Sequence, residues 1–193
     1  MRIAILGGTF SPIHYGHIKM AEAVIENNAA DQVLFMVAGN APHKRVETAK
    51  GEHRYNMVNL VCDNKKYCCS DLELNKETNY TFDTLTELSA KNPENEYYFI
   101  TGADMFLSLP KWYRAEELMK NFKFIAIDRE GSFIGKKEQF EKVRLLTDAT
   151  FISVKTPDIS STMVRDAVKQ GKSISSFVPK AVEDYIKENG LYL

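Results

Sequence analysis

The segment from Gly7 to His17, GGTFSPIHYGH, constrains the fold of this chain more than any other part of the sequence. It follows directly on an apolar run, residues 3–6, which is typical of a buried strand. Glycines at the end of a strand let the main chain approach a ligand, because they carry no side chain. The N–H groups of such a turn can bind an anion. The segment therefore predicts a strand that ends in a phosphate-binding loop.

Two histidines, His14 and His17, stand at the start of a helix that the apolar spacing over residues 18–25 predicts. Residues three apart share one face of a helix, and the helix dipole favours anions at its first turn. Gly16 between them costs about 1 kcal/mol relative to alanine inside a helix, so we expect it to make room for a ligand. Both imidazoles are therefore expected to face one phosphate. The alternative is a tight turn with two surface histidines.

The composition limits what the protein can be. With 193 residues, 44% of them hydrophobic and 26% charged, the chain can bury one substantial core, and we expect a single domain over residues 1–193. A formal charge of -1 argues against a nucleic-acid-binding surface, which normally shows a basic excess. No apolar run approaches the length of a membrane helix, and the N-terminus shows no signal-peptide pattern. We therefore expect a cytoplasmic protein that binds neither nucleic acid nor membrane.

The three cysteines do not have the pattern of a metal site. Cys62, Cys68 and Cys69 lack the paired spacing of zinc ligands, and adjacent residues of a strand point to opposite faces. We predict that they are reduced packing residues and that the protein's own side chains form no metal site.

Strand-like and helix-like segments alternate along the chain. The runs that predict strands cover residues 2–7, 32–38, 67–74, 96–101, 122–127 and 150–154. The polar stretch 128–135 reads as a loop, and the tail from Ser160 predicts two short helices, the second near residues 180–188. This alternation predicts an α/β fold: a Rossmann-like, doubly wound, mostly parallel sheet with helices on both faces and a short C-terminal helical tail. Ligands of such sheets bind beyond the carboxyl ends of the strands.

A basic loop, GNAPHKR over residues 39–45, follows the second predicted strand. Pro42 restricts the loop, and His43, Lys44 and Arg45 concentrate positive charge beside the strand end where phosphates are expected. Lys44 is predicted to neutralise them. The alternative is a solvated basic loop.

A capped helix is predicted by ISSTMVR, residues 159–165. Ser160 or Ser161 can cap it, and the N–H groups of its first turn form another anion site. Arg165 lies one turn further along, where its planar guanidinium is expected to reach a phosphate through two hydrogen bonds. The alternative is an ordinary capped helix with a surface arginine.

The middle of the chain carries an aromatic loop, LPKWY over residues 109–113. Trp112 is the only tryptophan, and its setting beside proline and lysine is not that of a core residue. Its ring offers a stacking surface for an aromatic ligand, worth roughly 0.5–1.5 kcal/mol beyond its area. The alternative is a tryptophan half-buried against the neighbouring helix.

These motifs resemble those of the bacterial nicotinate-nucleotide adenylyltransferases, within the nucleotidylyltransferases whose signature is HxGH. The family motifs are GGTFDPIHxGH, PPHK, YTxDT, GADxxxxLPxW and ISSTxIR, and the match spans residues 3 to about 165. The chain departs from them at Ser11, where aspartate is common, at Ala41, which replaces the first proline, and at Glu130, in a turn that is commonly RPG.

The resemblance implies transfer of the adenylyl group of ATP to nicotinate mononucleotide, giving nicotinate adenine dinucleotide and pyrophosphate in NAD biosynthesis. Mg²⁺ is expected on the ATP phosphates, since it prefers substrate oxygens and water. The attacking phosphate has a second pKa near 6, so it is largely ionised and needs no general base. We therefore expect in-line attack without a covalent intermediate, with the catalytic groups acting as donors to phosphate oxygens. These groups are His14, His17, Lys44 and Arg165.

The resemblance also implies two sets of binding residues. The set for ATP and its phosphates contains Gly7, Gly8, Thr9, Phe10, His14, His17, Lys44, Gly102, Asp104, Ile159, Ser160, Ser161 and Arg165. The set for the pyridine nucleotide contains Thr9, His43, Lys44, Thr81, Trp112 and Tyr113. In the first set, Asp104 is expected to bind ribose hydroxyls, and its alternative is a simple helix N-cap.

Two other functions fit part of the pattern. Pantetheine-phosphate adenylyltransferases share the opening motif but need no pyridine pocket. A nucleotide-sensing module would keep the fold without turnover, although a chain this short has no room for an output domain. The preference for nicotinate over nicotinamide nucleotides and the oligomeric state stay open, and a homo-oligomer is compatible with the sequence.

Overall fold

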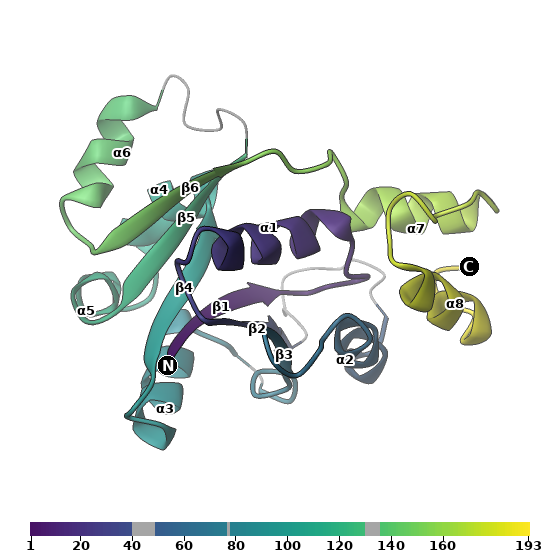
Figure 1. The fold of residues 1–193 in the computed structure, drawn as a ribbon, viewed down its shortest axis with the longest axis horizontal. Helices are drawn as coiled ribbons and strands as arrows, with labels where there is room; N and C mark the ends of the chain where they lie inside the picture. The colour runs from purple at the N-terminus through teal and green to yellow at the C-terminus, as the bar shows by residue number, and fades with distance from the viewer. Residues whose placement is uncertain (40–48, 77, 130–135) are drawn as a thin grey trace.

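The computed structural model describes residues 1–39, 49–76, 78–129 and 136–193. Within these residues, six strands form one sheet in the order β3-β2-β1-β4-β5-β6, and every neighbouring pair is parallel (Figure 1). The strands are β1 (Arg2–Gly8), β2 (Gln32–Val37), β3 (Tyr67–Ser70), β4 (Glu96–Gly102), β5 (Lys123–Arg129) and β6 (Ala149–Val154). This confirms the Rossmann-like, doubly wound fold that the alternation predicts.

Helices cover both faces of the sheet, as Figure 1 shows. They are α1 (Tyr15–Glu26), α2 (Gly51–Asn59), α3 (Thr81–Lys91), α4 (Ala103–Ser108), α5 (Ala115–Asn121), α6 (Lys137–Arg144), α7 (Ser161–Lys169) and α8 (Lys180–Glu188), with a 3₁₀ turn at Leu109–Lys111. The helical tail predicted from Ser160 is present as α7 and α8. The first helix begins at Tyr15 because Pro12 and the extended His14 precede it.

The core has two layers, one on each face of the sheet. In β1, Ala4 and Leu6 pack with α1, α2, α7 and α8, whereas Ile3 and Ile5 pack with α3, α4, α5 and α6. Successive residues of a strand point to opposite faces, so a strand covered on both sides must be apolar throughout. This is why β1 reads as a continuous apolar run in the sequence.

Two predicted boundaries were wrong. The third strand was expected over 67–74 but ends at Ser70, because the Ser70 hydroxyl accepts from the N–H of Leu72 and a turn follows in which the Leu74 N–H donates to the Asp71 carbonyl. Asp128 and Arg129, which were expected in a loop over 128–135, instead pair with β6 at the end of β5, and the rest of that segment lies outside the described residues. Both errors involve polar residues: Ser70 ends the strand β3, whereas Asp128 and Arg129 belong to the strand β5.

The three cysteines take no part in a disulfide. Cys62, Cys68 and Cys69 are free and half-buried, and burial raises the pKa of Cys62 and Cys69 to about 12, so both stay thiols at neutral pH. In the described part of the chain, no helix has both the length and the apolar character needed to cross a membrane.

Candidate active site

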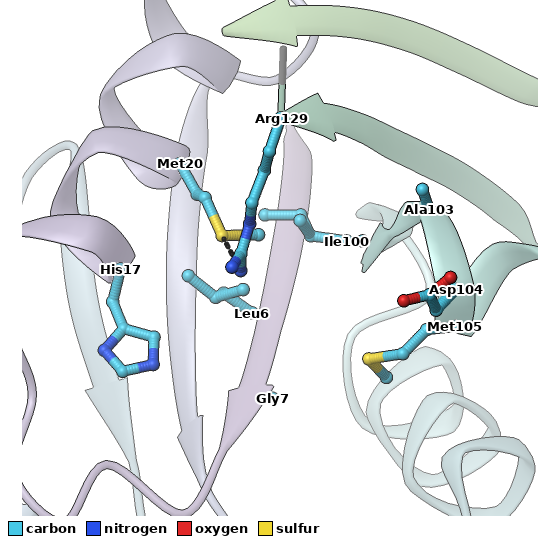
Figure 2. Close-up of a pocket in the computed structure, with 10 residues that line it drawn as sticks. Leu6, Gly7, His17, Met20, Ile100, Ala103, Asp104, Met105 and Arg129 are labelled. Carbon is cyan, nitrogen blue, oxygen red and sulfur yellow. Dashed lines mark hydrogen bonds between the residues drawn. The ribbon is translucent and has the colours of Figure 1, made fainter. Parts of the chain in front are cut away.

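A hollow of about 380 Å³ opens at the carboxyl ends of the central strands (Figure 2). It lies where β1 stands between β2 and β4, the point at which the strand order reverses and at which doubly wound sheets bind their ligands. Its walls come from β1, α1, β4, α4 and β5. The lining residues are Leu6, Gly7, His17, Met20, Ile100, Gly102, Ala103, Asp104, Met105 and Arg129.

The glycine-rich turn is shaped by its own phenylalanine. Phe10 has a left-handed φ of 48° and is only 2% exposed, with its ring edge-on to His17 at 5.0 Å. A Cβ on Gly8 would stand 2.9 Å from that ring, so only glycine fits there. Phe10 was expected among the residues that bind ATP, and its side chain is buried in the core. Any contact between Phe10 and a ligand must therefore come from its main chain.

The two histidines stack on each other at the start of α1, with ring centroids 3.7 Å apart. The His14 N–H donates to Nδ1 of His17 over 3.3 Å, which leaves the proton of a neutral His17 on Nε2. His17 borders the hollow, as Figure 2 shows, whereas His14 is 6% exposed and its Nδ1 has no hydrogen-bond partner among the described residues. A Cβ at Gly16 would meet the His14 ring at 3.0 Å. Gly16 therefore makes room for the His14 ring, and the expectation that it makes room for a ligand stays a prediction.

Both imidazoles are neutral at physiological pH. Burial, and then the positive charge of Arg129, lowers the pKa of His14 to about 4. Burial, followed by the charges of His14 and Arg129, lowers the pKa of His17 well below its usual value. The pair can therefore donate hydrogen bonds, but the lowered pKa values disfavour the positively charged imidazolium.

These shifts predict a stability that depends on pH. The unfolded chain binds protons at its histidines below about pH 6.5, whereas folded His14 does so only near pH 4. The free energy of unfolding should therefore fall as the pH drops from 6.5 to 4, with His14 contributing on the order of 3 kcal/mol. Urea unfolding at a series of pH values tests this, with His14→Gln as the control that should show a shallower slope. Equal slopes in the two proteins would contradict it.

Arg129, at the end of β5, was not predicted as a site residue. Figure 2 shows its side chain extending into the hollow, where Nη2 lies 3.1 Å from Sδ of Met20. The same residue borders a second, mainly polar hollow of about 200 Å³, together with residues 156–159. A basic residue at the carboxyl end of a predicted strand was the signal in the sequence. It was missed because this segment was assigned to a loop.

Hydrogen bonds hold helix α7 to the loop before α1. The Ser160 hydroxyl accepts from the N–H of Met163 over 3.2 Å, which makes Ser160 the cap. Ser161 Oγ donates to the carbonyl of Pro12 over 2.9 Å. Arg165 Nη1 donates to the carbonyl of Ser11 over 2.8 Å, so one arm of the guanidinium expected at a phosphate already holds the loop. The predicted neighbour Ile159 places its carbonyl near Gly16.

The two segments expected to form the pyridine pocket, one around Thr81 and the other around Trp112, contact each other. Tyr80, the residue before α3 and Thr81, stacks on Tyr113 with ring centroids 4.2 Å apart. Trp112 is half-buried: its Nε1 donates to Ser108 Oγ over 3.0 Å, and its ring stands edge-on to Phe99. Half-burial fits both interpretations of Trp112, the stacking surface for a ligand and the tryptophan packed against its neighbouring helix. These residues do not line the 380 Å³ hollow.

Asp104 stands in the first turn of α4, at the mouth of the hollow. The cap of this helix is Gly102, so the N-cap alternative for Asp104 was wrong. Its exposed carboxylate accepts from Lys136 Nζ over 2.6 Å, and this bond lowers the pKa of Asp104. The predicted His43 and Lys44, like the departures Ala41 and Glu130, lie outside the described residues.

Arg54 of α2 is a functional candidate that sequence reasoning missed. It is 1% exposed, and its guanidinium donates to three carbonyls: Thr9 at 2.8 Å, Ala38 at 2.7 Å and Ala49 at 3.2 Å. It thereby ties the glycine-rich turn to the end of β2 and to the start of α2. A single arginine in a polar helix gave no signal of this role.

The chain resembles known proteins over its whole length. The family model described as cytidylyltransferase-like matches residues 5–167. A protein of Caldicellulosiruptor saccharolyticus named "Probable nicotinate-nucleotide adenylyltransferase" is 40% identical, covering 100% of this chain and 99% of the relative. One of the same name from Clostridium botulinum is 37% identical, covering 98% of each chain.

Solved structures share the fold. Nicotinic acid mononucleotide adenylyltransferase of Plasmodium falciparum, solved in complex with NaAD, superposes with a TM-score of 0.79 at 24% identity, covering 99% of this chain and 97% of that one. The extent of the family match and the identity to the two bacterial proteins show that the chain belongs to the nicotinate-nucleotide adenylyltransferases of the cytidylyltransferase-like family.

Proposed function

We propose that this enzyme transfers the adenylyl group of ATP to nicotinate mononucleotide, giving nicotinate adenine dinucleotide and pyrophosphate. The observation that carries the proposal is His17, a neutral imidazole beside Gly7 and Arg129 in the hollow at the switch point of the sheet. Its Nε2–H is a fixed donor for a phosphate oxygen. The names of the related bacterial proteins support the choice of substrates.

The chemistry asks for positioning and charge neutralisation. The 5'-phosphate of the mononucleotide attacks the α-phosphorus of ATP, a new P–O bond forms, and the bond to pyrophosphate breaks on the opposite side. The attacking phosphate is largely ionised at neutral pH, so the protein need not remove a proton. Neutral imidazoles suit this role, because preorganised donors stabilise developing charge without reorganising during the reaction.

The other predicted residues fall into two groups in this proposal. The first group binds ATP as proposed from the sequence, with Arg129 added. It comprises the main chain of Gly7, Gly8, Thr9 and Phe10, the side chains of His14 and His17, the N-terminus of α7 with Arg165, and Gly102 with Asp104. Around the pyridine nucleotide, Thr81, Trp112 and Tyr113 act together with Thr9, His43 and Lys44. Lys44 is also proposed to neutralise the ATP phosphates. Asp104 would accept from the ribose hydroxyls through Oδ2, since its Oδ1 accepts from Lys136.

Mg²⁺ would be held by the substrate in this proposal. No group of three or more metal-ligating side chains occurs in the described ranges, and of the described residues that line the hollow only Asp104 carries a carboxylate. Such a lining fits an ion that keeps its waters and binds mainly to phosphate oxygens. The ion would add positive charge at the triphosphate.

The test is pyrophosphate release from ATP and Mg²⁺ with one acceptor at a time. Nicotinate mononucleotide should support turnover, nicotinamide mononucleotide should report the base preference, and phosphopantetheine should give none. Turnover with phosphopantetheine alone would overturn the proposal, and ATP binding without any product would indicate a sensing module. Four expectations from the sequence stay predictions: that the protein is a single domain, that it is cytoplasmic, that it does not bind nucleic acid, and that it can form a homo-oligomer.

Replacing Trp112 by alanine should raise the KM for nicotinate mononucleotide about tenfold and leave the KM for ATP nearly unchanged. The reason is the loss of a stacking surface together with the area it buries. Steady-state kinetics with each substrate varied in turn measures this. Trp112→Phe is the control, since it keeps a ring and should lose less. Equal increases in both KM values would count against stacking.

A further inference from the structure

The C-terminal end of the chain contacts Ser11, which directly follows the glycine-rich turn. The hydroxyl of Tyr192, one residue from the C-terminus, lies 2.9 Å from Ser11 Oγ, a contact that spans 181 residues of sequence. Figure 1 shows the C-terminus between α7 and α8. Ser11 is 2% exposed, so this contact is shielded from water. A shielded hydrogen bond fixes geometry more firmly than an exposed one.

Ser11 joins three parts of the molecule. Its Oγ accepts from the N–H of Ala49 over 3.2 Å, at the start of α2, and also meets Tyr192. Its carbonyl accepts from Arg165 of α7. Ser11 stands directly after Phe10, whose left-handed backbone shapes the turn, and three residues before His14. A shift of Ser11 would therefore move the turn and the stacked histidines together.

Tyr192 is held where it can reach Ser11. Its backbone has a φ of 65°, a left-handed conformation that is costly for a tyrosine and persists only where the surroundings impose it. The Leu191 N–H donates to the carbonyl of Ile186 over 3.0 Å, which folds the tail back onto α8. The Tyr192 ring packs against the core layer that contains α1 and α7. Burial raises its pKa to about 12, so the hydroxyl keeps its proton.

We propose that Tyr192 is a positioning residue for adenylyl transfer, which acts through the Ser11 hydroxyl on the turn that presents Gly8 and His14. The C-terminal tail thus completes the nucleotide site without touching substrate. This proposal rests on the proposed function, because its effect is measured as a change in that reaction.

The chain offers a matched control in Tyr185 of α8. Its hydroxyl also reaches α2, where it lies 3.0 Å from His53 Nδ1 and accepts from Asn56 Nδ2 over 3.0 Å. Both tyrosines therefore hold the C-terminal segment to the rest of the molecule through a partly buried hydroxyl, but only Tyr192 contacts the glycine-rich loop. Replacing either by phenylalanine removes a hydroxyl and keeps the ring.

The experiment compares Tyr192→Phe with Tyr185→Phe below the unfolding temperature of both. Tyr192→Phe should lower kcat about fivefold, the effect of one neutral hydrogen bond, with the KM for nicotinate mononucleotide unchanged. Tyr185→Phe should lower the unfolding temperature without changing kcat. A wild-type protein inactive with nicotinate mononucleotide would refute the proposed function instead, so the two failures are distinguishable.

A double-mutant cycle tests the route through Ser11. Ser11→Ala should lower kcat at least as much as Tyr192→Phe, and adding Tyr192→Phe to it should change kcat no further, because both remove the same contact. The proposal is overturned if the two losses multiply, or if Tyr192→Phe matches Tyr185→Phe in kcat.

Discussion

Replacing His17 by alanine is expected to lower kcat about a hundredfold or more, which corresponds to roughly 2.7 kcal/mol of transition-state stabilisation. His17 borders the hollow, and its Nδ1 already accepts from the His14 N–H, so its Nε2–H is free to face a phosphate oxygen. Because the imidazole is neutral, the loss is that of a positioned hydrogen-bond donor. Single-turnover kinetics with saturating ATP and nicotinate mononucleotide measures it directly.

The control for this prediction keeps the donor and removes the imidazole. In His17→Gln the side-chain amide can place an N–H near the position of Nε2, so a smaller loss than in His17→Ala is expected. The KM for ATP should change less than kcat in both variants, since the bond strengthens as charge develops. A folded His17→Ala protein with near-normal kcat would remove His17 from the mechanism.

The sheet was predictable because burial on both faces leaves a direct record in the sequence. β1 has core residues on both of its faces, so every position from Ile3 to Leu6 is apolar. The edge strand β3 has weaker burial, and its end at Ser70 depends on a hydroxyl that accepts from a main-chain N–H. The central strands were accordingly placed well, and the errors fell where polar groups decide the boundary.

The site was predictable where function depends on local spacing and not where it depends on distant contacts. His14 and His17 were expected side by side at the start of one helix, and their rings stack there. That both face one phosphate stays a prediction. The closeness of Gly16 to the His14 ring was not foreseen, because it depends on how that ring is oriented. Arg54 binds carbonyls of segments far apart in the chain, which no local pattern reports. Arg129 was missed because its segment was assigned to a loop, although it ends β5.

Replacing Arg54 by methionine is expected to lower the free energy of unfolding by about 3 kcal/mol or more. Methionine fills much of the space of the arginine stem but donates nothing, so the carbonyls of Thr9, Ala38 and Ala49 lose the guanidinium that binds them. Each buried carbonyl left without a donor costs about 1–3 kcal/mol, and relief of the charge buried with Arg54 offsets part of the total. Urea unfolding at neutral pH measures the change.

Two further variants decide whether the guanidinium itself matters. Arg54→Lys keeps the charge but lacks the planar fork that serves three carbonyls at once, so it should recover only part of the loss. Arg144→Met removes an exposed arginine at the end of α6, 3.6 Å from Glu141, and should change the free energy of unfolding by less than about 0.5 kcal/mol. Because Arg54 holds the carbonyl of Thr9, kcat should fall in Arg54→Lys even at temperatures where that variant is fully folded. Full activity in folded Arg54→Lys would limit the residue to a role in stability.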